Sequence, residues 1–293
     1  MIRLQNYRSG RTFQFFNNAL MIILSLSMLS PLIHLTAVSF SSPKFVGAKQ
    51  VYFWPKGFNI EVYKTIVSTH SIWKSLGVSV YITVFGTLIA LVFVSSIAFA
   101  LSRPNMPYKK LILKGIIVTL VFSLPLIPSY LVVRALSMDN TLWALMMPGA
   151  LSAFNVIIMK TFFQGISSEI FDAAKIDGCG ELRIYGRIVI PLSTPVIATI
   201  ALFHAVGQWN SYFSALIYIH ERSLMPIQVL LRSLVIEDNL ISMSPTGVDL
   251  AVPSTPEMLK AGIILFGTLP ILIVYPFLQK FFVKGAMLGS LKE

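Results

Sequence analysis

Long apolar stretches alternate with shorter polar segments along the chain, and this pattern predicts membrane-spanning helices. A helix needs about 20 mostly apolar residues to cross the hydrocarbon core of a bilayer. Six stretches reach this length, at about residues 16–40, 76–101, 111–133, 141–163, 191–219 and 261–283. We therefore expect an all-α integral membrane bundle of six transmembrane helices.

The first stretch is interpreted as a retained span and not as a cleaved signal peptide. It is long, contains Pro31 and His34, and is followed by no A-x-A cleavage site before the next segment. The expected organisation is a cytoplasmic N-terminal segment (1–15), a six-span domain (16–283) that includes a cytoplasmic loop (164–190), and a cytoplasmic tail (284–293).

The composition agrees with residence in a membrane. Of the 293 residues, 55% are hydrophobic and 12% are charged, and the mean hydropathy is +0.76. Soluble domains contain about 25% charged residues, so this chain cannot cover a globule with a water-soluble surface. A soluble domain, a disordered chain and a disulfide scaffold are therefore excluded. The single cysteine, Cys179, also excludes an intramolecular disulfide and a cysteine-based metal cluster.

The net charge of +11 would suggest nucleic acid as a partner if the protein were soluble. In a membrane protein it is better explained by topology, because cytoplasmic loops carry an excess of Lys and Arg. We therefore expect no nucleic acid partner, and both termini in the cytoplasm. With this orientation the cytoplasmic segments contain Arg3, Arg8, Arg11, Arg103, Lys109, Lys110, Lys114, Lys160, Lys175, Arg183, Arg187, Lys280, Lys284 and Lys292.

Prolines interrupt several of the expected spans. Each one removes a backbone hydrogen bond and kinks the helix axis. Such breaks persist in a membrane where neighbouring helices or a water-filled cavity satisfy the freed carbonyl groups. Ordinary kinks of a helical bundle remain the alternative, but together the prolines favour a transporter over a simple anchor. They are Pro31, Pro125, Pro128, Pro270 and Pro276.

The cytoplasmic loop has the signals of a helix, a glycine turn and a second helix. Ser168 is expected as the N-cap, and Glu169 lies in the first turn, where the helix dipole favours an anion. Gly178 is placed where a residue with positive φ would end the helix. A second helix is predicted at 181–190, and Pro191 is expected to open the fifth span.

One face of the first loop helix is expected to carry Ile170, Ala173 and Ala174. Small alanines between apolar residues allow another surface to approach closely, as for a helix that lies in a groove of a partner protein. From the residues alone, a surface helix that lies against its own bundle is an equal alternative.

The same loop resembles the "EAA" loop of permease subunits from bacterial binding-protein-dependent ABC importers. In that family E-A-A is followed by a glycine and then by I-x-x-P. The matching residues here are Asp172-Ala173-Ala174, Gly178 preceded by Asp177, Ile188 and Pro191. Asp172 departs from the usual Glu but keeps the negative charge.

Three further segments are similar to the carbohydrate branch of this family, which includes maltose-type and complex-polysaccharide permeases. They are Ala100-Leu101-Ser102-Arg103, the sequence from Ala205 to Ser211, and the sequence from Lys284 to Ser290. Within this branch the chain resembles permeases of alginate importers. The resemblance covers nearly the whole chain.

The resemblance implies a type I ABC importer permease in the bacterial inner membrane, paired with a second, similar permease. Two ABC ATPase subunits and an extracytoplasmic solute-binding protein would complete the importer of an oligosaccharide or polysaccharide. The chain itself would need no cofactor, since ATP and Mg would bind the ATPase, and it contains no G-x-x-x-x-G-K-[ST] sequence. The residues implied in coupling to the ATPase are Glu169, Asp172, Ala173, Ala174, Asp177, Gly178, Ile188 and Pro191.

Polar residues within the fifth span are candidates for a saccharide path. His204, Gln208 and Ser211 fall on one helix face, and polar groups inside a span usually face a cavity or the bundle interior. Their alternative role is to hold helices together. The first outer loop is rich in lysine, which would suit an anionic saccharide. The other candidates are Trp209, Asn210, Tyr212 and Phe213 in the same span, Asn155 in the fourth and Tyr130 in the third.

Three other functions are considered. An intramembrane enzyme is disfavoured, because the chain has neither an H-E-x-x-H nor a G-x-S-x-G sequence. An ABC permease for a non-sugar solute remains an alternative. An ion-coupled secondary carrier is also an alternative, but it would need buried carboxylates, and the expected spans contain none.

Overall fold

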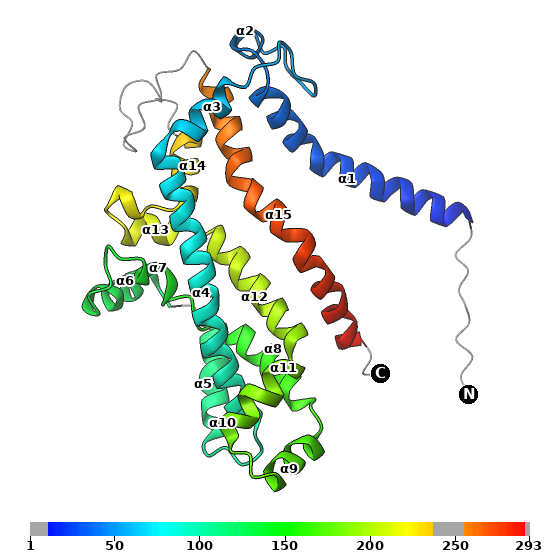
Figure 1. Cartoon of the computed structure of the whole chain (residues 1–293), viewed down its shortest axis with the longest axis vertical. Helices are drawn as coiled ribbons and strands as arrows, with labels where there is room; N and C mark the ends of the chain where they lie inside the picture. Colours follow the sequence, from blue (N-terminus) through cyan, green and yellow to red (C-terminus); the bar gives the residue numbers. More distant parts are fainter. Residues whose placement is uncertain (1–10, 123, 237–254, 291–293) are drawn as a thin grey trace. The chain divides into compact units, whose positions relative to one another are not determined.

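The computed structural model describes residues 11–122, 124–236 and 255–290, and every regular element in these ranges is a helix (Figure 1). The chain divides into two compact units. The first contains residues 1–69 and 237–266, and the second contains residues 70–236 and 267–293. The all-helical architecture expected from the sequence is confirmed.

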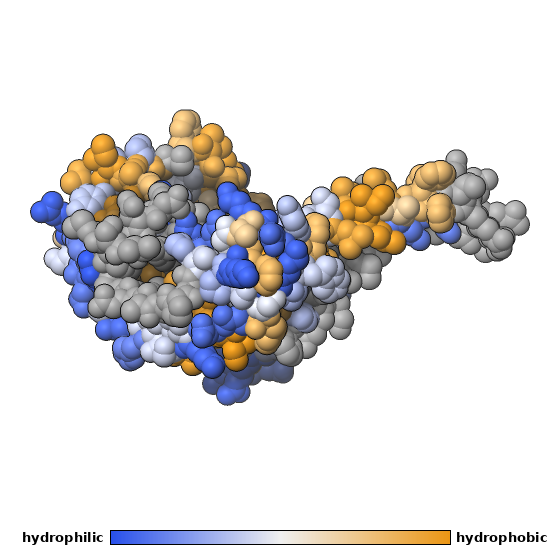
Figure 2. Space-filling view, turned by 90° about the horizontal axis from the view of Figure 1, so that it is seen from above, coloured by the Kyte–Doolittle hydropathy of each residue, from blue (hydrophilic) through white to orange (hydrophobic). Residues whose placement is uncertain are grey.

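The first unit is built from α1 (Arg11–Ser39), α2 (Pro43–Gly47), α3 (Glu61–Ser68) and the first turns of α15 (Pro256–Ser290). Most side chains of α1 are exposed and apolar, from Phe13 onward, and Figure 2 shows them as hydrophobic atoms along this helix. In water this surface would be unfavourable, whereas lipid tails or other membrane helices can cover it. Helix α1 is therefore well suited to cross a membrane.

The core of the first unit forms where α3 meets α15. Val62 and Ile66 of α3 are fully buried. Gly262 of α15 faces them so closely that a Cβ atom added there would lie 2.5 Å from Cγ1 of Val62 and 3.0 Å from Cδ1 of Ile66. A small residue at this point lets two backbones approach, as is common between membrane helices.

The second unit is organised around α4 (His70–Ser102), which is 33 residues long and runs without a break (Figure 1). Helices α7, α8, α12 and α14 all pack against it. The other elements of this unit are α5 (Lys109–Val121), α6 (Leu126–Ala135), α7 (Trp143–Met146), α8 (Ala153–Gln164), α9 (Ser168–Ile176), α10 (Glu181–Ile184), η1 (Tyr185–Val189), α11 (Ile190–Leu192), α12 (Thr194–Trp209), α13 (Phe213–Tyr218), η2 (Arg222–Leu224), α14 (Ile227–Ile236) and the part of α15 from Gly267 onward.

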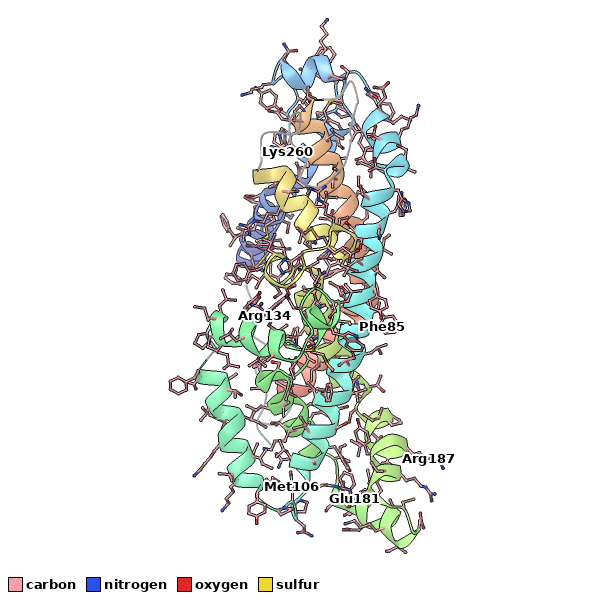
Figure 3. The ribbon with its side chains drawn as sticks, turned by 90° about the vertical axis from the view of Figure 1, so that its left-hand side faces the viewer. Phe85, Met106, Arg134, Glu181, Arg187 and Lys260 are labelled. Atoms are coloured by element: carbon pink, nitrogen blue, oxygen red, sulfur yellow. The ribbon has the colours of Figure 1, made fainter. Side chains whose placement is uncertain are left out.

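Two apolar clusters hold these helices to α4. One, at the C-terminal end of α4, joins Val94 and Ala98 to Met159 of α8 and Ile200 of α12. The other, toward the N-terminal end, joins Ile82 to α7, α13 and α14. Figure 3 shows Met106 and Glu181 at the same end of the unit, with Phe85 midway along α4. Helix α4 therefore connects two packed regions.

Three helices in the described residues are long and apolar enough to cross a membrane: α1, α4 and the first part of α15. Up to five spans result if each of two bent pairs is counted as one span. Helices α5 and α6 form the first pair, with a bend of 119°. Pro125 is the N-cap of α6 and Pro128 lies in its first turns, so these prolines begin a new helix, whereas Pro31 lies inside α1.

The fifth expected span differs from the continuous helix that was predicted to open at Pro191. Residues 181–192 and 194–209 meet at an angle of 81°, and α12 begins at Thr194. Pro195 explains the break, because it has no N–H group to donate to the carbonyl of Pro191. The hydroxyl of Thr194 donates to that carbonyl instead, at 2.7 Å. The span also ends early, since α12 stops at Trp209.

The prediction of one continuous helix at 141–163 is wrong. Helix α7 ends at Met146, residues 147–152 are not helical, and α8 begins at Ala153. Pro148 has no N–H group to donate to the carbonyl of Ala144, so it cannot continue the hydrogen bonding of α7, and Gly149 gives the chain freedom to turn. The Pro-Gly pair was the local signal of this break, and a hydropathy window averages over it.

We predict that Gly262→Ala destabilises the protein. The added methyl group overlaps Val62, which is buried and cannot move away, and overpacking of this kind costs about 1–3 kcal/mol. The midpoint of thermal unfolding of the detergent-solubilised protein should fall, as measured by size-exclusion chromatography after heating.

Two variants control this experiment. Gly77→Ala adds the same methyl group on α4, where nothing lies within 4 Å of the new atom, and should leave the midpoint unchanged or raise it. Val62→Ala, combined with Gly262→Ala, should restore part of the loss. An unchanged midpoint for Gly262→Ala alone would contradict the close packing of α3 and α15.

Candidate functional site

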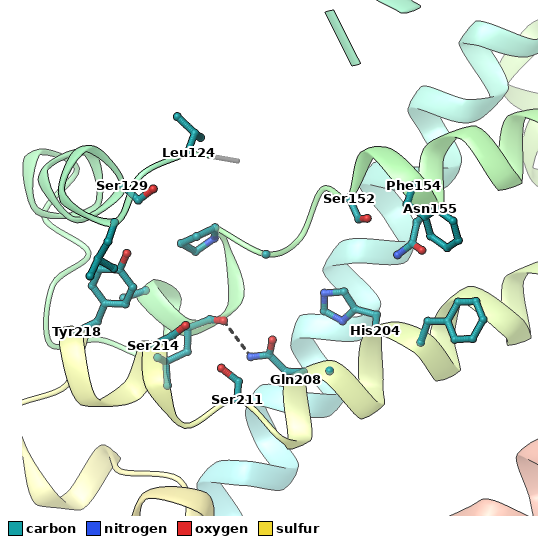
Figure 4. Close-up of a pocket in the computed structure, with 17 residues that line it drawn as sticks. Leu124, Ser129, Ser152, Phe154, Asn155, His204, Gln208, Ser211, Ser214 and Tyr218 are labelled. Carbon is teal, nitrogen blue, oxygen red and sulfur yellow. Dashed lines mark hydrogen bonds between the residues drawn. The ribbon is translucent and has the colours of Figure 1, made fainter. Parts of the chain in front are cut away.

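A cavity of about 790 Å³ lies within the second unit, beside the non-helical segment 147–152 (Figure 4). Helices α6, α7, α8, α12 and α13 each contribute to its walls. Its polar lining residues are Ser129, Ser152, Asn155, His204, Gln208, Ser211, Ser214 and Tyr218.

Helix α12 and the residues just after it form one wall. His204, Gln208 and Ser211 all line the cavity, so the helical spacing correctly predicted that they share a face. Nε2 of Gln208 donates a hydrogen bond to the carbonyl of Leu145, at 2.9 Å. Nδ1 of His204 lies 3.3 Å from Oγ1 of Thr87 on α4. Two of the three side chains are therefore held in place by neighbouring elements.

The start of α8 forms a second wall. Ser152 is the N-cap residue of α8, and Asn155 lies in its first turn with only 6% of its surface exposed. Figure 4 shows Asn155 and His204 on opposite sides of the same space. The break at 147–152 places the beginning of α8 here, which a continuous helix would not do.

Ser214 and Tyr218 of α13 and Ser129 of α6 complete the polar lining. Tyr130 does not line the cavity itself, but its ring stacks on that of Tyr218, with 6.0 Å between centroids. The expected candidate Tyr130 thus supports a lining residue.

The lining offers hydroxyl, amide and imidazole groups, and Phe154 and Phe203 add aromatic rings. The described lining residues include no Lys, Arg, Asp or Glu. Such a surface can exchange many hydrogen bonds with a polyhydroxylated molecule, because hydroxyl and amide groups both donate and accept. It offers no fixed charge to bind an ion tightly.

Besides Tyr130, four residues predicted from the sequence to line a path do not line this cavity. Trp209 is buried, and Asn210 donates a hydrogen bond to the carbonyl of Val206 in its own helix. Tyr212 lies beneath the guanidinium of Arg232, at 4.5 Å from the ring centroid, and Phe213 is exposed. Helix α12 ends at Trp209, so the residues after it turn in other directions.

Sequence reasoning missed Ser129, Ser152, Ser214 and Tyr218. Ser211, Ser214 and Tyr218 have the spacing i, i+3, i+7, which would have extended the polar face of the fifth span. Ser152 and Ser129 had no such signal, since their position depends on breaks in the helices. Across the described part of the chain, no group of three His, Cys, Asp or Glu side chains could hold a metal ion.

The loop at 164–190, which was expected in the cytoplasm, forms two helices with a glycine turn between them. The N-cap of α9 is Ser167, whose Oγ accepts a hydrogen bond from the backbone N–H of Glu169, so the expected cap at Ser168 is wrong by one residue. Gly178 has a φ of +76°, as the expected C-terminal turn requires. The second helix, expected at 181–190, begins at Glu181 and runs through α10, the π-helical turn η1 and α11 to Leu192.

The two faces of α9 differ from the expected arrangement. Ala174 is buried and Phe171 packs against the apolar cluster at the end of α4, whereas Ala173 is exposed. Ile176 and, on α10, Leu182 are each 86% exposed. Ala173 and Ala174 thus lie on different faces, because a helix turns about 100° per residue. The loop exposes the apolar side chains of Ile176 and Leu182, while Ala174 and Phe171 attach it to the bundle.

The remaining residues named for coupling fall into two groups. Glu169, Asp172 and Asp177 are exposed on or directly after α9. Ile188 lies in η1 and packs against the apolar cluster, and Pro191 lies in α11 with its surface exposed. The acidic side chains are thus accessible to a partner, and Ile188 is a packing residue.

A sequence profile described as "Binding-protein-dependent transport system inner membrane component" matches residues 97–288. Two relatives from Bacillus subtilis (strain 168) are each 40% identical to the chain. Protein LplC aligns over 99% of this chain and 98% of its own length. The polygalacturonan/rhamnogalacturonan transport system permease protein YtcP aligns over 97% and 99%.

Solved structures share the fold. A chain from the crystal structure of a bacterial ABC transporter involved in the import of the acidic polysaccharide alginate has a TM-score of 0.87 and 31% identity, over 94% of this chain and 98% of that chain. A chain from a bacterial alginate ABC transporter in complex with an alginate pentasaccharide-bound periplasmic protein has a TM-score of 0.55 and 13% identity, over 92% and 93%.

These similarities confirm the resemblance to ABC importer permeases that was seen in the loop at 164–190. They also confirm the type I permease fold. The profile covers more than half of the chain, and both relatives align along nearly all of it. The chain therefore belongs to the family of binding-protein-dependent transport system inner membrane components.

Proposed function

We propose that this chain is one of two permease subunits of an ABC importer that moves an acidic oligosaccharide or polysaccharide across the bacterial inner membrane. The observation that carries the substrate class is the cavity, whose eight polar side chains are all suited to bind sugar hydroxyl groups. Both chain termini lie in the cytoplasm in this proposal, and six spans cross the bilayer.

The acidic character of the substrate is supported by the named relatives. YtcP is named for polygalacturonan and rhamnogalacturonan, and the structure at 31% identity comes from an alginate importer. In this chain the described lining of the cavity has no Lys or Arg, and the first unit carries exposed lysines. They are Lys44, Lys49, Lys56 and Lys64. These side chains can attract a carboxylated saccharide.

Energy is supplied by separate ATPase subunits, two copies of which dock on the two permeases. In this chain the docking surface is the exposed side of the cytoplasmic loop, where Ala173, Ile176 and Leu182 are apolar and Asp172 and Asp177 are charged. An exposed apolar patch with a charged rim is typical of protein interaction sites. A solute-binding protein delivers the saccharide from the other side, and ATP with Mg binds the ATPases.

The proposal is tested by purifying the complex in mild detergent through a tag on this chain. Native mass spectrometry should detect one other permease and two ATPase copies. In proteoliposomes with the binding protein, oligogalacturonate should stimulate ATP hydrolysis more than a neutral maltooligosaccharide does. Stimulation by an amino acid or peptide would contradict the substrate class, and uptake by the chain alone, driven by an ion gradient, would contradict the ABC mechanism.

We predict that Gly178→Val lowers transport while the protein still inserts into the membrane. At a φ of +76° a side chain costs about 1–2 kcal/mol, so the turn between α9 and α10 is distorted and the docking surface is displaced. Sugar-stimulated ATPase activity and uptake in proteoliposomes should both fall.

The matched control for this prediction is Gly180→Val, two residues away. Gly180 has a φ of −73°, which any residue adopts, and nothing lies within 4 Å of an added Cβ. Uptake by this variant should remain near that of the wild type. Equal uptake by both variants would remove the support for the turn as a coupling element.

We also predict that Asn155→Ala raises the KM for saccharide uptake by about 2- to 10-fold, the loss expected for one hydrogen bond to a neutral group. Asn155 faces the cavity and can bond a sugar hydroxyl. Asn210→Ala is the same substitution at a residue outside the lining and should leave the KM unchanged. If Asn210→Ala had the larger effect, the saccharide path would lie elsewhere.

A further inference from the structure

The C-terminal end of α4 holds the coupling loop (164–190) through Ser95 and Phe99 of the helix and through Arg103, which directly follows it. They are spaced by four residues, so they lie within about a quarter of the helix circumference. Each contacts a residue of the segment between α9 and η1. This set of contacts is separate from the exposed side of the loop that is proposed to dock on the ATPase.

Arg103 has the most extensive contacts of the three. Its guanidinium lies 4.0 Å from the ring centroid of Phe171 on α9 and 4.7 Å from that of Phe99. Its Nη2 and Nε donate to the same carboxylate oxygen of Glu181 on α10, at 2.7 Å and 3.0 Å. One side chain thus joins α4 to both helices of the loop.

This ion pair differs from an ordinary surface salt bridge. Exposed pairs contribute little because water screens them and long side chains lose entropy. The Glu181 side chain is 55% exposed, but that of Arg103 is only 16% exposed, and two aromatic rings fix its planar guanidinium, which favours a charge-assisted hydrogen bond of defined geometry. Its backbone carbonyl also accepts a hydrogen bond from Nζ of Lys109, at the start of α5.

The second contact is at Tyr185, the first residue of η1. Its hydroxyl lies 2.6 Å from Oγ of Ser95, and its ring centroid is 5.2 Å from that of Phe99. Single π-helical turns inside helices often occur at functional sites. Here the π-helical turn η1 follows directly after α10. Arg103 contacts α9 and α10, and Ser95 contacts η1, so the loop is attached to the end of α4 at three successive elements.

The same helix also reaches the cavity. Thr87 of α4 contacts His204, and a Cβ atom at Gly86 would lie 3.6 Å from the side chain of Gln208. Arg103 is 16 residues from Thr87, a distance of about 24 Å along a helix. Helix α4 contains no proline and no break over this length, so a displacement at one end is transmitted to the other.

We propose that Arg103 is a positioning residue that makes α4 and the α9–α10 loop move as one body, so that a displacement of the loop reaches the cavity wall. This inference rests on the proposed function, because the loop is assumed to receive the ATPase. Arg103 touches neither the substrate nor the nucleotide. Together with the Ser95–Tyr185 hydrogen bond, it adds polar contacts of defined geometry to the apolar packing between α4 and the loop, which by itself allows sliding.

The test compares Arg103→Gln with Arg103→Lys in the full complex, reconstituted with the binding protein and oligogalacturonate. Arg103→Gln removes the charge and should lower the number of sugar molecules imported per ATP hydrolysed by about tenfold, as for the loss of charged hydrogen bonds. ATPase subunits should still co-purify. Arg103→Lys keeps the ion pair without the planar stacking and should restore part of the ratio.

Glu181→Gln should reproduce the effect of Arg103→Gln, and the double variant should be no worse than either single variant. Lys114→Gln removes a positive charge from an exposed position on α5 and serves as the control with an unchanged ratio. Tyr185→Phe retains the ring but loses the bond to Ser95, and should lower the ratio in the same direction.

The outcomes separate the two proposals. If the wild-type complex contains no ATPase, the proposed function fails, and the number of sugars imported per ATP hydrolysed cannot be defined. If the wild type is coupled and Arg103→Gln imports the normal number of sugars per ATP, the positioning role is overturned. The role is also overturned if Arg103→Gln and Glu181→Gln both lose the ATPase subunits, since Arg103 would then be needed only for assembly.

Discussion

The structure depends on one constraint, which is that backbone polar groups within a membrane must find partners inside the protein. Several helices of the second unit are broken, and side chains supply the missing partners. Gln208 donates to the carbonyl of Leu145 where α7 ends, Thr194 donates to Pro191 where α11 ends, and Ser129 donates to Pro125 at the start of α6. Because broken helices need polar neighbours, the breaks and the polar cavity occur together.

In contrast to the broken helices, α4 is continuous over its whole length. Three polar side chains of α4, Ser79, Thr87 and Ser95, and Arg103 directly after the helix are spaced by eight residues, and each meets a different element. Ser79 accepts a hydrogen bond from the backbone N–H of Ile227, Thr87 contacts His204, Ser95 contacts Tyr185 and Arg103 binds Glu181. Eight residues advance the helix by about 80° beyond two full turns, so the series follows a slow spiral. Helix α4 and the residue after it therefore fix the positions of α14, α12, η1 and α10.

The parts that could be predicted from the sequence are those set by short-range patterns. Apolar length located α1, α4 and α15, a single glycine located the turn at Gly178, and helical spacing placed His204, Gln208 and Ser211 together. The rest depends on packing. Arg103 and Glu181 are 78 residues apart, so no local pattern joins them, and which of Ala173 and Ala174 is buried is decided by the cluster beneath α9. The break at Pro148 and Gly149 was visible as a dipeptide, but its consequence, a second polar wall at Asn155, required the fold.

The neutral lining of the cavity has a physical consequence for an acidic substrate. A fixed cation there would be costly to bury, and it would hold a carboxylated chain by a strong, localised attraction. Transport requires binding that is favourable enough for entry and weak enough for release, which is better met by several sites of moderate strength. Hydroxyl and amide groups on three walls provide such sites, because each sugar can exchange one hydrogen bond for the next as it advances. In the proposed importer, recognition of charge is thereby assigned to the exposed lysines of the first unit and passage to the neutral cavity of the second.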